Sequence, residues 1–261
     1  MYCGRVAPSH QTVPQFVRLA GHALRWRLLT ELAGGDLRVR ELMTLTGQPQ
    51  NLISYHLRLL RDGGLITAVR SSFDGRDSYY HLDLDRCAEM LAQTGTALHP
   101  GVHPALRVVP APRGPQDLPV SVLFVCTGNS ARSPIAEALL RHHAFGGVEA
   151  ASAGTQPKPR LHPRAAPVLR AGYGIDISRQ RPRHLSTLTG RRFDYLITLC
   201  DKAREVCPEL VDHIRLVHWS IPDPSDLTGK ASYPAFDGIT ADIDARIRYL
   251  LPVLNTKEVQ P

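Results

Sequence analysis

One cysteine and one arginine stand at a spacing that could bind and attack an oxyanion. The run VSVLFVCTGNSARSPIAEALL places Cys126 directly after an apolar stretch and Arg132 six residues later. Successive backbone N–H groups of a tight loop that opens a helix point at an anion, and the helix N-terminus adds positive potential there. That potential also favours the thiolate, which is the nucleophilic form of a cysteine. The spacing therefore predicts an anion site with a nucleophile inside it.

Neighbouring residues of the same run would complete the site. The planar guanidinium of Arg132 can hold two oxygens of a tetrahedral oxyanion, and Ser133 can donate its hydroxyl to the thiolate. The loop residues whose backbone would bind the oxyanion are Thr127, Gly128, Asn129, Ser130 and Ala131. Such a site suits covalent attack on phosphate or arsenate. A buried structural cysteine is the alternative, but the order of strand, glycine-containing loop and helix favours the anion site.

Residues 118–255 resemble the low-molecular-weight protein tyrosine phosphatase superfamily, which includes the thioredoxin-coupled arsenate reductases. Besides the run above, FDYLITLCDKAREVCP carries Cys200 and Cys207, and HWSIPDPSD carries an Asp-Pro pair at Asp223. The two cysteines are similar to the redox pair of the reductases, which tyrosine phosphatases do not require. The phosphatases usually have an aromatic residue after Asp-Pro, where this chain has Ser225. Both features favour the reductase.

The resemblance implies a thiol–disulfide cascade. Cys126 would attack arsenate held by Arg132 and the loop amides, while Asp223 protonates the departing oxygen. Cys200 would then attack Cys126 so that arsenite leaves, and Cys207 would attack Cys200. Thioredoxin would reduce the final disulfide, with mycothiol or glutaredoxin coupling as an alternative. A turn aspartate before proline is the alternative role for Asp223.

The residues between the two downstream cysteines would have to rearrange if those cysteines pair. On a helix, seven positions at a rise of about 1.5 Å separate Cα atoms by about 10 Å. A disulfide tolerates roughly 7 Å at most. The segment DKAREV between Cys200 and Cys207 would therefore unwind on oxidation, and its polar residues permit exposure. Two unrelated thiols are the alternative interpretation.

The resemblance also suggests the structural potassium site that some of these reductases use. Asn129, Glu137 and Ser152 fall at its positions, but the fourth, acidic position lands near Arg183 and His184. A basic side chain there would replace the ion. We therefore expect no tightly bound cofactor, with potassium the one ion to consider. The remaining histidines form no coherent ligand set, so no metal site is expected.

The N-terminal part of the chain predicts a separate DNA-binding domain. Apolar residues recur every three or four positions in VRLAGHALRWRLLTELA, RVRELMTLTG and PQNLISYHLRLLRDGG, which predicts three short helices. LITAVR and DSYYHLDL predict a two-stranded hairpin, and a last helix should span 84–98. Residues 14–98 resemble the ArsR-type repressors, whose winged helix-turn-helix places one helix in the major groove.

This resemblance assigns the DNA contacts. Glutamine and asparagine can read adenine edges, and arginine can hold guanine or phosphate. The assigned residues are Gln50, Asn51, Ser54, Tyr55, His56 and Arg58 on the third helix and Arg70 and Arg76 on the wing. A merely solvated polar face is the alternative. Because such repressors act on two-fold operators, the resemblance implies a homodimer bound to a double-stranded DNA operator.

One departure from that family concerns metal sensing. Many members carry a Cys-x-Cys pair on the helix that here reads DLRVREL, where this chain has Arg38 and Arg40. That thiolate site is absent. Cys3 and Cys87 remain as candidate arsenite ligands, although two cysteines so far apart in sequence are more often unrelated.

Composition agrees with an intracellular protein of two domains. The chain has 261 residues, 43% of them hydrophobic, and a formal net charge of +7, which suits anionic partners. Five cysteines without a framework spacing predict reduced thiols in the cytoplasm. No apolar run approaches the roughly 18 residues of a membrane helix, so no membrane partner is expected.

The predicted fold class is an α+β winged helix-turn-helix domain at 1–98, a proline-rich linker at 99–117, and an α/β domain at 118–261. The last should contain a four-stranded parallel sheet, with strands near 120–125, 148–152, 193–199 and 214–219. The predicted function is a DNA-binding regulator fused to an arsenate reductase. Two alternatives stay open: fusion to a phosphatase that does not need the downstream cysteines, and an oxyanion-binding domain that senses without turnover.

Overall fold

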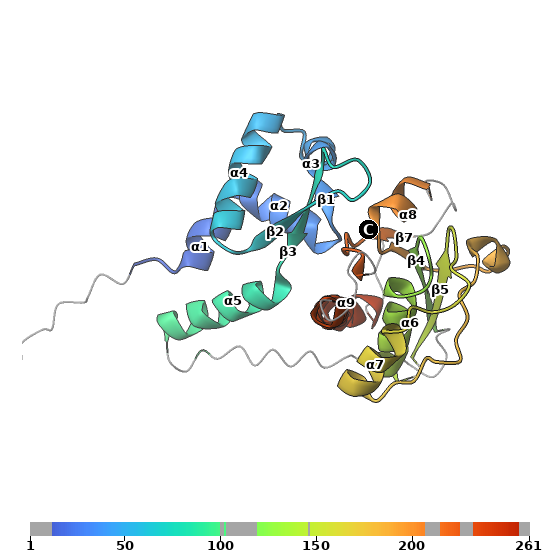
Figure 1. Ribbon diagram of the computed structural model, residues 1–261. Helices are drawn as coiled ribbons and strands as arrows, with labels where there is room; N and C mark the ends of the chain where they lie inside the picture. Colours follow the sequence, from blue (N-terminus) through green and yellow to red (C-terminus); the bar gives the residue numbers. More distant parts are fainter. Residues whose placement is uncertain are drawn as a thin grey trace, which may run out of the picture. The chain divides into compact units, whose positions relative to one another are not determined.

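The computed structural model describes residues 12–99, 102, 119–145, 147–206, 215–224 and 232–255. The chain divides into two compact units, most of whose elements Figure 1 labels. The first unit comprises residues 1–33, 39–67 and 81–106, and the second comprises 34–38, 68–80 and 107–261. The second unit therefore contains two short segments from the N-terminal half of the chain, which we call the 34–38 segment and the wing segment (68–80).

The first unit is built from helices whose apolar residues face a common core. The helices are α1 (Gln15–Ala20), α2 (Ala23–Ala33), α3 (Val39–Thr46), α4 (Gln50–Asp62) and α5 (Leu84–Leu98). In α4 the buried positions Ile53, Leu57 and Leu60 recur every three or four residues, as the sequence pattern predicts. The predicted helix at 84–98 is confirmed, and the Asp83 carboxylate caps it by accepting a bond from the Arg86 N–H at 2.8 Å.

Two details differ from the sequence-based expectation. The run expected as one N-terminal helix is two, because α1 ends at Ala20 before Gly21 and α2 begins at Ala23. The segment DLRVREL is not helical throughout: Leu37–Arg38 forms the short strand β1, and α3 begins at Val39. Two residues are too few for a strand periodicity to be read from the sequence.

A three-stranded sheet forms the wing, in the order β1-β3-β2. The predicted hairpin is confirmed as β2 (Ile66–Arg70) and β3 (Ser78–Leu82). Strand β1 pairs antiparallel with β3, with Leu37 opposite Tyr80 and Arg38 opposite Tyr79.

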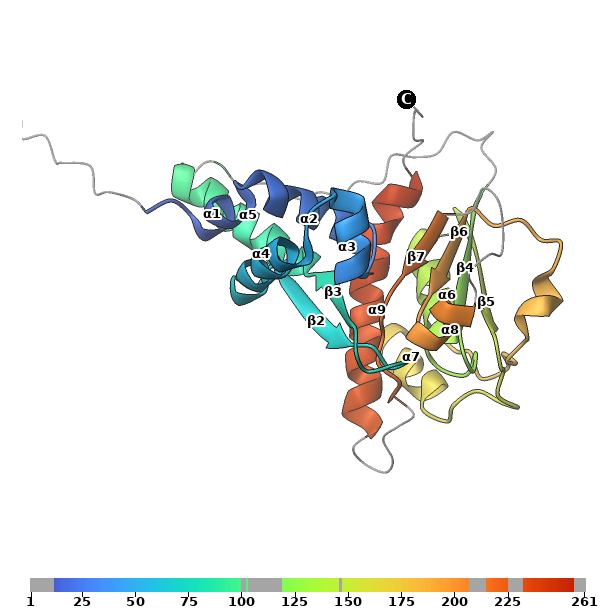
Figure 2. The same ribbon diagram turned by 90° about the horizontal axis from the view of Figure 1, so that it is seen from above.

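The second unit contains the predicted four-stranded parallel sheet, in the order β5-β4-β6-β7. Its strands are β4 (Val120–Cys126), β5 (Val148–Gly154), β6 (Tyr195–Thr198) and β7 (Arg215–His218), each within a few residues of its predicted position. The helical elements are α6 (Arg132–Ala144), α7 (Ala165–Tyr173), the 3-10 helix η1 (Leu185–Leu188), α8 (Asp201–Val206) and α9 (Ser232–Asn255). Helix α6 packs on β4 and β5, and α7 and α9 pack against α6 (Figure 2).

The sheet brings chemistry-bearing residues to one edge. Strand β4 is buried from Val122 to Cys126, so the apolar stretch before the cysteine is the centre of the core. Since the strands are parallel, their carboxyl ends meet at the same edge, where α/β proteins bind ligands. Cys126 ends β4, Cys200 follows β6, and His218 ends β7 at that edge. In the part of the chain that the structure describes, none of the helices combines the length and apolar character needed to cross a bilayer.

Candidate active site

Cys126 lies at the junction of β4 and the loop that opens α6. Its side chain is buried, with 2% exposed. The Asn129 N–H donates to Cys126 Sγ at 3.2 Å, and Ser133 Oγ lies 3.1 Å from the same sulfur. The Asn129 N–H, the Ser133 hydroxyl and the N-terminus of α6 therefore surround the sulfur. The role predicted for Ser133 has the geometry it requires.

Asn129 holds the shape of the loop. Its backbone has φ 46°, a left-handed conformation that asparagine tolerates better than most residues. Its Nδ2 donates to Ser133 Oγ and to Ser152 Oγ, both at 2.9 Å, and its Oδ1 accepts from the Arg183 N–H at 2.9 Å. The loop also needs Gly154 on β5, because a Cβ there would lie 2.7 Å from the Thr127 carbonyl oxygen. The loop is therefore fixed from both sides.

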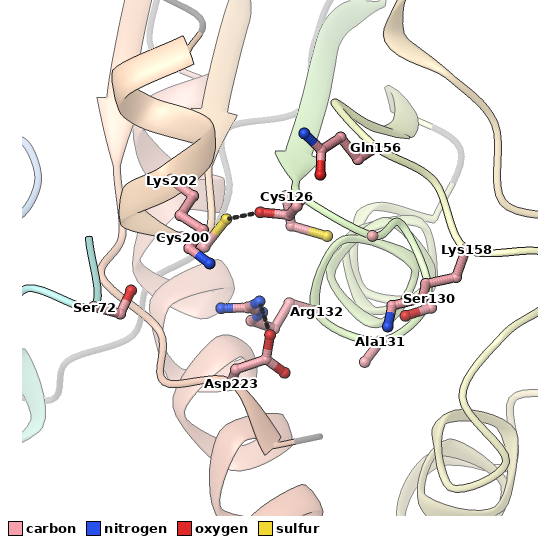
Figure 3. Close-up of a pocket in the computed structure, with 12 residues that line it drawn as sticks. Ser72, Cys126, Ser130, Ala131, Arg132, Gln156, Lys158, Cys200, Lys202 and Asp223 are labelled. Atoms are coloured by element: carbon pink, nitrogen blue, oxygen red, sulfur yellow. Dashed lines mark hydrogen bonds and ion pairs between the residues drawn. The ribbon is translucent and has the colours of Figure 1, made fainter. Parts of the chain in front are cut away.

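The Arg132 guanidinium faces the pocket opposite the cysteine, as Figure 3 shows. It is buried, donates to the Ile221 carbonyl oxygen at 2.9 Å, and pairs with Asp223 Oδ2 at 2.5 Å. The Asp223 side chain is 35% exposed, so its carboxyl group reaches the mouth of the pocket. A guanidinium and a carboxyl group therefore line the same cavity as Cys126.

One cavity of about 430 Å³ joins these groups. Sequence reasoning anticipated most of its lining but missed Ser72, Gln156 and two lysines. The lining residues are Ser72, Cys126, Thr127, Gly128, Ser130, Ala131, Arg132, Gln156, Lys158, Cys200, Lys202 and Asp223. Lys158 and Lys202 add positive charge around Arg132 and make the cavity attractive to anions. No spacing signal marks a lone lysine, so only the fold could identify them.

Cys200 opens on the same cavity as Cys126. It directly precedes α8, is 3% exposed, and its Sγ lies 3.3 Å from Thr127 Oγ1. The loop that surrounds the first sulfur therefore also contacts the second. Cys207, the third cysteine of the predicted cascade, lies outside the described residues.

A buried polar network stands behind Cys200. Asp201 Oδ1 accepts from His218 Nε2 at 3.1 Å and from Ser220 Oγ at 2.9 Å, and His218 Nδ1 lies 2.8 Å from Thr198 Oγ1. Burial alone would raise the pKa of Asp201, but hydrogen bonds, led by that from His218, lower it to about 2. Burial lowers the pKa of His218 more than Asp201 raises it. Near neutral pH, the pair is therefore a carboxylate and a neutral imidazole.

The residues at the expected potassium position form a different arrangement. Glu137 is buried and accepts from Ser152 Oγ at 2.6 Å and from Gln180 Nε2 at 2.7 Å. The same carboxylate pairs with Arg141 at 2.8 Å and with Arg183 at 3.5 Å. Two guanidinium groups and two neutral donors already surround the carboxylate, so this set does not fit a monovalent cation. Across the described residues, no three His, Cys, Asp or Glu side chains gather as they would around a metal ion.

The residues assigned to DNA contact lie in two places. On α4 and the wing, all but one are exposed: Gln50, Asn51, Ser54, Tyr55, Arg58, Arg70 and Arg76. His56 is the exception and corrects the assignment: it is 4% exposed, and its ring centroid lies 4.5 Å from that of His22. Burial lowers its pKa, with His22 and Arg25 adding to the effect. His56 therefore belongs to the core side of α4 and does not face a DNA groove.

A parallel sheet that delivers a cysteine to a C-x5-R loop, with an aspartate paired to the arginine, defines a cysteine-dependent oxyanion-handling α/β domain. The match to the family model agrees: the low molecular weight phosphotyrosine protein phosphatase model matches residues 121–260, and the chain belongs to this family. A model of bacterial regulatory proteins of the arsR family matches residues 23–68, so the N-terminal part carries an ArsR-family helix-turn-helix.

Named relatives match the C-terminal part of the chain. The arsenate reductase of Brevibacillus brevis is 34% identical over 128 residues, which are 49% of this chain and 91% of that protein. The arsenate reductase of Shouchella clausii is 34% identical over 131 residues, again 49% and 91%. A solved arsenate reductase in a phosphate-binding state is 27% identical, with a TM-score of 0.46, over 52% of this chain and 98% of that one.

Proposed function

We propose that the C-terminal domain reduces arsenate to arsenite by a thiol–disulfide cascade and that the N-terminal domain binds operator DNA. The observation that carries the enzyme assignment is that Cys126 and Cys200 line one cavity together with Arg132 and Asp223. A phosphatase needs the first cysteine only. The names of the two relatives described above support the same choice.

Each pocket residue has a defined role in the proposed cycle. The Cys126 thiolate attacks arsenic while Arg132 and the loop amides hold the oxygens, and Asp223 gives a proton to the oxygen that departs as water. Cys200 attacks the Cys126 sulfur, the S–As bond breaks, and arsenite leaves with its electron pair. Cys207 then attacks Cys200 and frees Cys126. In all, two thiols and arsenate give one disulfide, arsenite and water.

The deciding experiment measures arsenate-dependent NADPH consumption with thioredoxin and thioredoxin reductase, beside hydrolysis of an aryl phosphate. We expect reductase turnover that is lost in Cys126→Ser, Cys200→Ser and Cys207→Ser proteins. Cys207→Ser should still release one arsenite per chain, because the first two thiols suffice for one reduction. Phosphatase activity that needs only Cys126, with no reductase activity, would instead establish the phosphatase. Replacing thioredoxin by a mycothiol or glutaredoxin system identifies the reductant.

DNA binding, dimer formation and a cytoplasmic location form the second part of the proposal. The ArsR-family match and the exposed polar face of α4 support a two-fold operator as the partner. Asn51→Ala should weaken binding to duplexes selected by the full-length protein, and Arg70→Ala should lower the salt dependence of binding. Asn51→Ala binding as tightly as wild type would contradict the assignment of α4 as the reading helix. Sedimentation of the DNA-free protein tests the dimer.

We further propose that catalysis needs no potassium, because Arg183 and Arg141 neutralise Glu137. Turnover should be equal in potassium and tetramethylammonium buffers of the same ionic strength. Arg183→Gln should gain a response to potassium, since its carboxylate partner loses one of its two guanidinium groups. A potassium requirement in the wild-type protein would contradict the proposal.

A further inference from the structure

The residues of α8 hold the wing segment within the second unit. Asp201 Oδ2 accepts from the Ser72 N–H at 2.6 Å and from Ser72 Oγ at 2.9 Å. Glu205 pairs with Arg38 at 2.8 Å, and the Arg38 side chain is only 10% exposed. Three charged or polar contacts therefore connect the six-residue helix to segments more than 120 residues earlier in the chain.

Arg204 and the aromatic ring of Tyr79 extend this connection. Arg204 donates to the Asp36 carbonyl oxygen at 3.2 Å, and its guanidinium carbon lies 5.2 Å from the centroid of the Tyr79 ring. Tyr79 is 1% exposed, and its ring also lies 4.6 Å from that of His218. Half of the residues of α8, namely Asp201, Arg204 and Glu205, thus contact the wing segment or the 34–38 segment.

The 34–38 segment has a second anchor that does not involve α8. Asp36 is 2% exposed and pairs with Arg246 of α9 at 2.9 Å. Its carboxylate accepts from the Ser220 N–H at 2.7 Å, and its own N–H donates to the His218 carbonyl oxygen at 2.8 Å. Unwinding of α8 would leave these bonds in place. The wing segment, in contrast, depends on Asp201 for the bonds at Ser72.

Oxidation and these contacts compete for the same residues. The six residues of α8 are all the residues between Cys200 and Cys207. A helix of these six residues rises about 9 Å along its axis, which is more than the roughly 7 Å that a disulfide between the two flanking cysteines tolerates, so forming that disulfide requires α8 to unwind. Unwinding changes the backbone positions of Asp201 and Glu205 and so removes the contacts to Ser72 and Arg38.

From this competition we infer that α8 is a redox-controlled latch on the wing segment: it holds the segment while the two cysteines are thiols and releases it when they form a disulfide. The inference rests on the proposed cascade, in which arsenate accepts the two electrons and the disulfide forms between Cys200 and Cys207. Because Arg70 and Arg76 of the wing segment are the predicted phosphate contacts, each turnover of the enzyme is transmitted to the DNA-binding surface.

Amide hydrogen exchange of the full-length protein tests the latch. The thiol-reduced protein is compared with protein oxidised by one round of arsenate without thioredoxin, while free thiols and released arsenite are counted in the same samples. We expect peptides from residues 68–80 to exchange at least about tenfold faster after oxidation, since the protected Ser72 amide loses its acceptor. Peptides covering 34–38 should change less than those from 68–80, because the Asp36 N–H keeps its bond to the His218 carbonyl oxygen and Arg246 still holds the Asp36 carboxylate.

A matched variant and a second oxidant separate the two proposals. In Cys207→Ser protein the cascade stops at a disulfide between Cys126 and Cys200, so the same arsenate treatment should leave 68–80 protected. If arsenate forms no disulfide, the proposed function fails, and diamide is then used to form the disulfide directly. If 68–80 exchanges at an unchanged rate in protein that carries the Cys200–Cys207 disulfide, formed with either oxidant, the latch is wrong. Arsenite released in the same samples would still support the proposed reductase activity.

Substitutions test the same contacts without oxidation. In the reduced protein, Glu205→Ala and Asp201→Asn should each raise the exchange rate of 68–80. Asp201 holds Ser72 directly, whereas Glu205 holds Arg38, which in turn pairs with Asp77 of the wing segment at 3.7 Å. Glu149→Ala, which breaks the exposed pair with Arg191 at 3.3 Å, is the matched control and should not raise that rate. If Asp201→Asn does not fold, Glu205→Ala decides, and exchange equal to that of Glu149→Ala would contradict the latch.

Discussion

The loop at Cys126 and the helix α8 after Cys200 present two cysteines to one cavity but are held in opposite ways. The loop is held by its own residues and by neighbouring segments of the same α/β domain, through Asn129, Gly154 and the Arg183 N–H. Helix α8 is held by side chains from the wing segment, the 34–38 segment and β7. A nucleophile that must keep its geometry is thus supported locally, whereas the element that must move is supported by contacts that can be broken one by one.

The largest expected effect falls on the loop. Cys126→Ser replaces the nucleophile with a group of similar size, so the fold should persist while arsenate reduction falls at least about 10³-fold. The coupled NADPH assay measures the rate, and far-ultraviolet circular dichroism with thermal unfolding checks the fold. Substantial reductase activity in this variant would show that Cys126 is not the nucleophile that attacks arsenate.

Asp223→Asn tests the proton donor at the mouth of the same cavity. The amide keeps a hydrogen-bonding partner for Arg132 but cannot give up a proton, so kcat should fall by about 10²–10⁴-fold. Because arsenate still meets Arg132 and the loop amides, KM should change much less. A turn aspartate, the alternative role, would give an unchanged kcat and a lowered midpoint of unfolding.

Asp36→Asn tests how much the contacts of the 34–38 segment contribute to the stability of the second unit. The substitution removes one of the two described negative partners of the buried Arg246 and leaves its pair with Asp242 at 2.8 Å. Breaking one side of a buried pair should lower the free energy of unfolding by about 3 kcal/mol, as urea denaturation would measure. The control Glu149→Gln, at an exposed pair, should cost less than about 1 kcal/mol. Equal costs would show that the 34–38 segment adds nothing to the second unit.

The smallest expected effect is a pH dependence at Asp201. Its pKa in the folded protein is about 2, below its ordinary 3.8, so the folded state favours the carboxylate. The resulting stability is present above pH 4 or so and is lost as the pH falls from about 4 to about 2. The difference in unfolding free energy between wild type and Asp201→Asn should therefore shrink by about 2 kcal/mol over that range. A difference independent of pH would contradict the charged state assigned to Asp201.

Much of the fold follows from local patterns. The sequence predicts the helix at 84–98, the wing hairpin and the four strands, because residues within one short window specify each of them. The signals are the periodicity of apolar residues, the turn residues and the helix-capping residues. The break between α1 and α2 at Gly21 and the two-residue strand β1 were missed. Neither has enough residues to show a period, and β1 exists only because β3 lies beside it.

Within the site, the sequence by itself determined the loop chemistry of Cys126, Arg132 and Ser133, because the groups that act on the sulfur lie within seven residues of it. Only the tertiary structure decided that Cys200 shares that cavity, that Lys158 and Lys202 line it, and that His56 faces inward. It also decided that Arg38 pairs with Glu205. These facts depend on which distant segments pack together, and a periodic pattern carries no information about the partner that a side chain will meet across the fold.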